Sequence, residues 1–176
     1  MSKWIIVDVE SDGPAPGIDM YSMISFGAVV LDTKLDKTFK GLTAPISDLW
    51  NPAALAISNI TREEHMTYPR PMETMKKFDA WLKELNDQVV LVSDNPAYDW
   101  QWMNHYFYKY IGSNPFGFSA RRIGDIHSGL CKDYKAATSW KKYRKTKHTH
   151  DPVDDAKGNA EAILVFNEKF GFNAPV

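Results

Sequence analysis

Apolar residues along the chain fall into short unbroken runs and into longer segments with helical spacing. The run from Trp4 to Val7, with its β-branched content, predicts a strand over Trp4–Val9. Because both faces of this segment are apolar, we expect a central strand that is covered on both sides. Similar signals predict four further strands at residues 22–32, 37–43, 88–93 and 121–126. The short connection between the second and third strands predicts antiparallel pairing.

Helical periodicity marks three other segments. An apolar residue recurs every three or four positions from residue 72 to residue 86, which predicts an amphipathic helix there. Two more helices are predicted at residues 97–111 and 151–170, and residues 47–64 are expected to be loop-rich with short helical turns. The order β-β-β-α-β-α-β-α predicts an α/β fold with a mixed central β-sheet flanked by helices.

Two carboxylates interrupt the first strand at its end. Side chains alternate along a strand, so Asp8 and Glu10 project from the same face. Two buried carboxylates at this spacing repel each other, and one of them should be pushed toward protonation. A hard divalent cation such as Mg²⁺ or Mn²⁺ would remove that cost, because it prefers oxygen ligands. The alternative is that the strand ends in solvent and both acids are hydrated.

Two predicted helices begin with the same pattern of residues. Asn95 and Asp151 are suitable N-caps, each is followed by proline, and Asp99 and Asp155 then occupy the fourth helical position. Open α/β sheets bind ligands at the carboxyl ends of their strands, so both aspartates could converge with the D-x-E pair. Taken alone, each aspartate is also explained as an acid that complements the helix dipole.

His150 occupies an unusual position before the last helix. The residue before an N-cap commonly packs an apolar side chain against the fourth helical residue, but here the two positions hold His150 and Asp155. An imidazole beside a carboxylate suits a group that accepts a proton from water. An exposed histidine in a basic loop is the alternative. His148 is a competing candidate for the base, and a neighbouring acid, Asp154, fits a capping role.

Composition narrows the class of protein. A chain of 176 residues with 44% hydrophobic and 24% charged residues fits one globular domain, so we expect a single domain over residues 1–176. The single cysteine, Cys131, excludes an intramolecular disulfide and fits a reducing compartment. We find no signal peptide and no apolar run of membrane-spanning length, and we expect a cytoplasmic protein.

These motifs together resemble the DEDDh branch of the 3′–5′ exonuclease superfamily, which has the ribonuclease H-like fold. The first motif is Asp8-Val9-Glu10 in "DVESDG", the second is Asp99 in "NPAYDWQW", and the third is His150 to Asp155 in "HDPVDDA". The resemblance covers nearly the whole chain and is strongest to small bacterial and phage exoribonucleases. It implies hydrolysis of single-stranded nucleic acid from a free 3′ end, with RNA favoured over DNA and release of nucleoside monophosphates.

The resemblance also implies roles for the motif residues. Asp8, Glu10 and Asp155 would hold one of two divalent cations, Mg²⁺ or Mn²⁺, and Asp8 and Asp99 would hold the other. His150 would act as the general base. Related exoribonucleases are often homodimers, so a homodimer is a possible assembly. A non-catalytic nucleic-acid-binding module and a structural domain whose acids only cap helices are the rival interpretations.

Residues that contact the substrate are harder to identify. Residues 121–147 contain nine Lys or Arg and two acids, and this local excess leads directly into His150. We expect basic residues there, Lys142 and Arg144 among them, to hold phosphates, although a solvated loop is the alternative. Trp102 is a candidate for stacking on a base. By analogy with the family, Met20 and Met23 could line the pocket for the terminal nucleotide.

Overall fold

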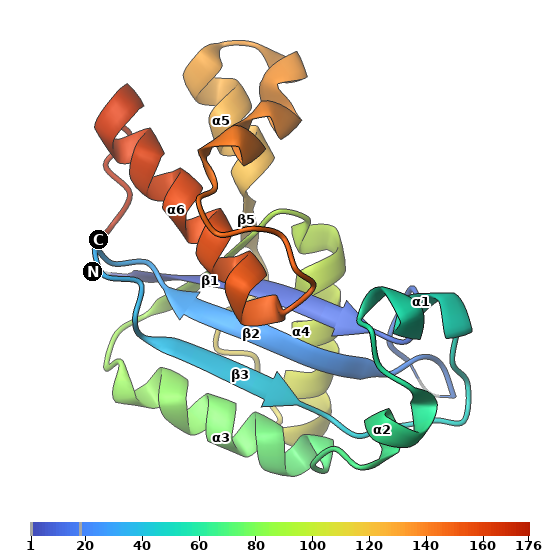
Figure 1. The fold of residues 1–176 in the computed structure, drawn as a ribbon. Coiled ribbons are helices and arrows are strands. Elements are labelled where there is room, and N and C mark those ends of the chain that lie inside the picture. Colours follow the sequence, from blue (N-terminus) through green and yellow to red (C-terminus); the bar gives the residue numbers. More distant parts are fainter. Residues whose placement is uncertain (1, 18) are drawn as a thin grey trace.

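The computed structural model describes residues 2–17 and 19–176, and its core is one mixed β-sheet (Figure 1). The strands lie in the order β3-β2-β1-β4-β5. Their bounds are β1 Lys3–Ser11, β2 Met23–Val30, β3 Thr38–Leu42, β4 Val89–Ser93 and β5 Ala120–Arg122. The first three strands form an antiparallel meander, as the short connection between them predicts, and β4 and β5 add parallel to β1. The predicted α/β fold with a mixed, helix-flanked sheet is confirmed, and β1 is its central strand.

Helices cover both faces of the sheet. On one face lie α3 (Pro71–Glu84) and α4 (Pro96–Tyr110), whose apolar side chains pack with Ile5, Val7 and Val9 of β1. On the other face, α6 (Pro152–Phe170) packs with Trp4 and Ile6. The alternation along β1 therefore divides its apolar residues between two hydrophobic clusters, which explains why both faces of this strand are apolar.

The chain differs from prediction after β4. Residues 121–126 were expected to form a strand, but β5 ends at Arg122 and α5 (Ile123–Cys131) follows at once. The 3₁₀ helix η1 (Tyr134–Tyr143) then packs against α5 and α6, where sequence alone indicated only a basic connection. The segment "RRIGDI" is too short for its pattern to separate a strand from a helix. Here burial of Ile123 and Trp140 in the cluster beneath α6 accompanies the helical form.

The loop-rich region contains two short helices, α1 (Pro52–Ile57) and α2 (Arg62–Met66), which agrees with the expected helical turns. Both lie beyond the carboxyl end of β1 (Figure 1). In the part of the chain that the structure describes, no helix combines the length and apolarity needed to cross a bilayer.

Candidate active site

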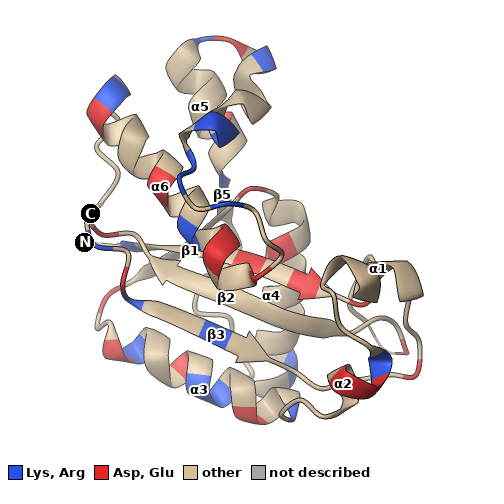
Figure 2. Ribbon diagram, in the orientation of Figure 1, with Lys and Arg blue, Asp and Glu red and all other residues tan. Residues whose placement is uncertain are grey.

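The carboxylates of β1 lie on the face of the sheet that α6 covers. Trp4 and Ile6 on this face belong to the core beneath α6, and Asp8 and Glu10 continue the same alternation toward the strand end. Figure 2 shows this acidic end of β1 next to the acidic first turn of α6, with a basic segment leading into that turn. The sequence prediction that the two acids share a face is confirmed.

Asp155 joins these acids because α6 approaches the sheet closely. Gly27 of β2 pairs with Asp8 across the ladder, and a Cβ at Gly27 would collide with the Pro152 carbonyl in the first turn of α6. The missing side chain lets the helix N-terminus lie directly on the sheet. One carboxylate oxygen from each of Asp8, Glu10 and Asp155 lies within 4.8 Å of the others. Asp155 itself is buried, whereas the neighbouring Asp154 is partly exposed.

Asp99 reaches the same region from α4. It occupies the fourth helical position, and its Oδ1 accepts a hydrogen bond of 3.0 Å from the Val9 backbone N–H. This bond anchors the start of α4 to the strand between the two acids of the D-x-E motif. Asp99 is buried and interacts electrostatically with Asp8, although it lies outside the compact group that Asp8, Glu10 and Asp155 form.

The four acids destabilise one another's charges. Burial raises the pKa of the Asp8 carboxyl well above its usual range, and the charges of Asp99, Glu10 and Asp155 raise it further. Burial likewise raises the pKa of Asp99 to about 7. Burial also raises the pKa of Glu10, although the hydrogen bond from Ser58 and the neighbouring His150 act in the opposite direction.

This site fits a divalent cation. Its converging donors are hard carboxylate oxygens, which are the ligands that Mg²⁺ and Mn²⁺ prefer. Among the described residues, none donates a hydrogen bond to the Asp8 carboxylate, so its oxygens are free to bind an ion. A cation between the acids would oppose the repulsion that, added to burial, raises the pKa values of Asp8 and Glu10.

The two histidines before α6 both lie beside these acids. His150 Nδ1 is 3.6 Å from Glu10 Oε1, and His148 Nδ1 is 2.8 Å from Asp155 Oδ2. Both side chains are exposed, with relative exposures of 41% for His150 and 55% for His148. The sequence favoured His150 as the base by its spacing to Asp155; the structure places both rings at the same carboxylate cluster.

The structure puts the two predicted phosphate contacts in different environments. Lys142 is exposed, and its ammonium lies 5.2 Å from the Tyr143 ring centre. The Arg144 guanidinium is largely buried, and its Nη2 donates a 2.8 Å hydrogen bond to Asp155 Oδ1. It lies against Gly158 of α6, where any side chain would collide with it. Arg144 is therefore a counter-ion of Asp155 in this structure, a role that its position in a basic run did not reveal.

Two predicted substrate contacts prove to be core residues. Trp102 and Met23 are completely buried in the cluster between the sheet and α3 and α4. Neither presents a surface on which a nucleotide could rest, because their side chains fill the space beneath β1 and β2. Met20 is 39% exposed and remains available to a ligand.

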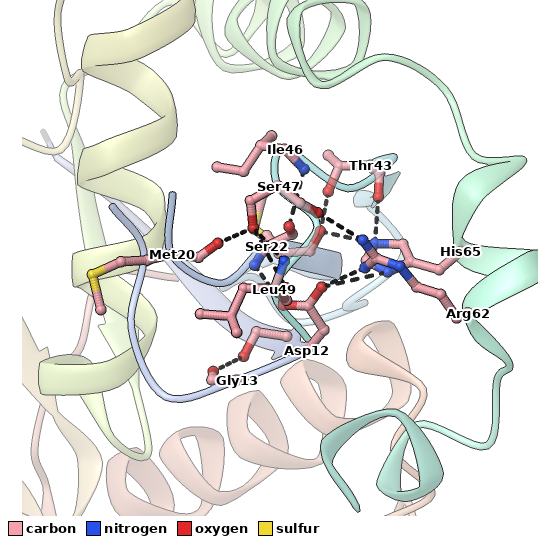
Figure 3. Close-up of polar contacts among 12 residues, drawn as sticks. Asp12, Gly13, Met20, Ser22, Thr43, Ile46, Ser47, Leu49, Arg62 and His65 are labelled. Carbon is pink, nitrogen blue, oxygen red and sulfur yellow. Dashed lines mark hydrogen bonds and ion pairs between the residues drawn. The ribbon is translucent and has the colours of Figure 1, made fainter. Parts of the chain in front are cut away.

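A buried polar network next to the site is the feature that sequence analysis missed (Figure 3). Asp12, just after β1, is fully buried and forms a 2.9 Å ion pair with Arg62 of α2. Arg62 also donates a 2.7 Å hydrogen bond to the Ser47 carbonyl, while Asp12 accepts one from the Ser22 backbone N–H. Burial lowers the pKa of the nearby His65 to about 4, so its imidazole is neutral at pH 7.

This network fixes the short helices against the end of β1. From the same region, Ser58 donates a 3.1 Å hydrogen bond to Glu10 Oε2. The α1–α2 segment therefore orients one of the site's carboxylates. The only sequence signal was an aspartate two positions after Glu10, which is too common a pattern to identify a buried ion pair.

Comparison with known proteins gives consistent matches. The family model RNase_T, described as exonuclease, matches residues 5–163. The 3′-5′ DNA exonuclease Cap18 of Escherichia coli is 33% identical over 179 residues, covering 94% of this chain and 91% of that protein. The nuclease domain of 3′hExo, a DEDDh family member bound to rAMP, superposes with a TM-score of 0.75 at 19% identity, covering 95% of this chain and 92% of that one.

A further structural match is the zinc-ion-bound E. coli ExoI–ssDNA complex. Its TM-score is 0.71 at 17% identity, and the match covers 96% of this chain and 41% of that one. These two structural matches show a shared fold, and the fold is the one that the three sequence motifs implied.

Proposed function

The chain belongs to the exonuclease family RNase_T, within the DEDDh superfamily of 3′–5′ exonucleases, and on that premise we propose that it hydrolyses single-stranded nucleic acid from a free 3′ end in a two-metal-ion reaction. The observation that carries the proposal is the convergence of the Asp8, Glu10 and Asp155 carboxylates, with Asp99 beside them. A domain that only binds nucleic acid has no use for clustered acids facing a polyanion. We also propose that residues 1–176 act as one exonuclease domain.

The four carboxylates have distinct roles as metal ligands in this proposal. Asp8, Glu10 and Asp155 would hold one Mg²⁺ or Mn²⁺, and Asp8 and Asp99 would hold a second. When bound, such ions lower the pKa of the attacking water and neutralise charge on the phosphate and the leaving 3′ oxygen. The protein contributes rigidity: β1 is a central strand, and the Val9–Asp99 and Ser58–Glu10 hydrogen bonds fix two of the carboxylates.

His150 is the proposed general base. Its Nδ1 faces Glu10 Oε1 at 3.6 Å, which leaves Nε2 to accept the proton of the attacking water. The exposure of the ring suits this role, because the nitrogen must reach a water at the edge of the site. Arg144 has a supporting role, since its hydrogen bond to Asp155 Oδ1 holds that carboxylate in place.

We propose DNA as the preferred substrate, in place of the RNA that the motif resemblance alone favoured. The supporting observation is the 33% identity to a DNA exonuclease over 94% of the chain. RNA remains the second candidate, because the motifs resemble those of small exoribonucleases. Exposed lysines of the basic segment, such as Lys142 and Lys145, would hold the backbone of either polymer as it enters the site.

The test is a matched substrate panel. DNA and RNA oligonucleotides of one sequence, labelled at the 5′ end and carrying a free or a blocked 3′ end, are incubated with the protein and Mg²⁺ or Mn²⁺. We expect stepwise shortening of the unblocked DNA only with a divalent ion, and slower shortening of the RNA. Asp8→Asn should abolish the reaction, whereas Asp125→Asn, at an exposed acid paired with Arg122, should not.

Each outcome decides one part of the proposal. Cleavage of the blocked oligonucleotide would contradict attack at the 3′ end, and faster loss of RNA would restore the first substrate assignment. Near wild-type turnover in Asp8→Asn under saturating metal would overturn the assignment of the carboxylates.

A further inference from the structure

A second set of potential metal ligands lies on the outer side of Asp155. His148, His150 and Asp155 each offer one ligand atom, and these three atoms lie within 4.8 Å of one another. His148 Nδ1 already contacts Asp155 Oδ2 at 2.8 Å, and the two imidazole rings are 4.3 Å apart between centroids. This set differs in chemistry from the group of Asp8, Glu10 and Asp155, because two of its three donors are nitrogen.

The backbone holds these two histidines on the same carboxylate. The backbone N–H of His150 donates to Asp155 Oδ2 at 3.1 Å, and that of Thr149 donates to Asp155 Oδ1 at 3.2 Å. His150 has a φ of 60°, a left-handed conformation that is uncommon for a residue with a side chain. Residues 148–150 therefore curl around Asp155, and this turn directs both imidazoles toward one point.

Two imidazoles and one carboxylate suit a transition-metal dication better than Mg²⁺. Zn²⁺ binds histidine nitrogen and carboxylate oxygen at about 2.0–2.2 Å in a tetrahedral arrangement, which separates its ligand atoms by roughly 3.3 Å. Because both histidine side chains are exposed, they can rotate until the ligand atoms reach this separation. The fourth coordination position of the zinc would stay open to water. Asp8 and Glu10 place two further carboxylates beside Asp155, and a bound cation would favour their ionised forms. The positive groups near His148 are Arg144, which pairs with Asp155, and Lys145 and Lys147, which are exposed and can turn toward solvent.

We propose that His148, His150 and Asp155 form a Zn²⁺ site that inhibits the exonuclease when it is occupied. Zinc bound there would coordinate His150, whose imidazole could then no longer accept a proton from water. It would also take as a ligand Asp155, which the proposed metal site shares with Asp8 and Glu10. Inhibition of this kind rests on the proposed function, in which His150 is the base. Binding of zinc does not, because it depends only on the three side chains.

The binding experiment uses the purified full chain after removal of metals with a chelator. Zn²⁺ is titrated by calorimetry, and Co²⁺ serves as a coloured substitute whose visible absorption reports nitrogen and oxygen ligands. The wild type should bind one Zn²⁺ that His148→Ala weakens by at least about tenfold. The matched control is His105→Gln, which removes a histidine from α4, six residues beyond Asp99, and should leave zinc affinity unchanged.

A replacement that keeps a ligand guards against a folding artefact. His148→Cys should restore tight zinc binding and should add a thiolate-to-metal absorption band to the Co²⁺ complex. If the metal-free wild type binds no Zn²⁺, or if His148→Ala binds it as tightly as the wild type, the site does not exist.

The activity experiment adds micromolar Zn²⁺ to reactions that contain excess Mg²⁺, with each variant normalised to its own rate in Mg²⁺ alone. Half-inhibition of His148→Ala should need at least about tenfold more Zn²⁺ than the wild type, and chelation should restore the rate. Equal sensitivity of both proteins would place the inhibitory zinc at the carboxylate group and overturn the proposal. If the protein degrades no oligonucleotide at all, the proposed function fails, while the calorimetry still decides whether the zinc site exists.

Discussion

Asp99→Asn should stabilise the metal-free protein, although it removes a carboxylate that the proposed reaction needs. Asp99 is buried, and burial raises its pKa to about 7 from an ordinary value of 3.8. Between these two values the folded state binds a proton that the unfolded state has released, so the free energy of unfolding falls as pH rises through this window. Asparagine keeps the oxygen that accepts the hydrogen bond from the Val9 N–H but carries no charge at any pH.

The size of the effect follows from the two pKa values. At about pH 7.5 the difference between 3.8 and about 7 corresponds to about 4 kcal/mol as an upper limit, since each tenfold change in proton affinity is worth 1.36 kcal/mol. At about pH 4 the same relation leaves less than about 1 kcal/mol. For a chain of this size each kcal/mol shifts Tm by about 2–4 °C, so we expect Asp99→Asn to raise Tm by at least about 4 °C at neutral pH.

The assay is thermal unfolding in chelator at several pH values between about 4 and 8, followed by circular dichroism. Asp154→Asn is the matched control, because Asp154 also lies in the first turn of a helix but is partly exposed and should show no such gain. Added Mg²⁺ should stabilise the wild type more than Asp99→Asn. A variant no more stable than the wild type at neutral pH, or equally stabilised at acid and neutral pH, would refute the electrostatic reasoning.

Three further outcomes are expected. His150→Ala should lower turnover by about 10²–10⁴-fold while oligonucleotide affinity, measured in metal-free protein, stays unchanged; a comparable loss of affinity would remove it from the role of base. Arg62→Ala should lower the free energy of unfolding by about 3 kcal/mol in urea denaturation, because it leaves the buried Asp12 without its partner, and a loss below about 1 kcal/mol would show that the pair is dispensable. Replacing Lys142 and Lys145 together with alanine should flatten the slope of log affinity against log salt by about one unit for single strands, and an unchanged slope would mean that neither touches a phosphate.

Local periodicity in the sequence was sufficient for most of the architecture. The apolar residues on both faces of Trp4–Val9 predicted a central strand, and the alternation of side chains along it predicted Asp8 and Glu10 on one face; both features are present. Proline one position after a polar cap predicted the starts of α4 and α6 and the helical positions of Asp99 and Asp155. These features depend on residues within one or two turns of each other, so the sequence encodes them directly.

Tertiary packing decided where elements that are distant in sequence meet. Residues 121–126 are compatible with a strand or a helix, and the contacts of α5 with η1 and α6 favour the helix from Ile123 onward. Trp102 and Met23 were candidates for substrate contact in the sequence, but their side chains fill the core. Their burial depends on which elements pack over them, and the sequence does not specify this.

The assembly of the carboxylate cluster required the most information beyond the sequence. Gly27 leaves room for the first turn of α6, which carries Asp155 to Asp8 and Glu10, and Gly158 leaves room for the Arg144 guanidinium beside Asp155. Residue types along the chain identified which carboxylates and histidines could do chemistry. Their distances, their pKa values and their partners arose from close contact between segments far apart in sequence, which no local pattern of hydrophobic and polar residues specifies.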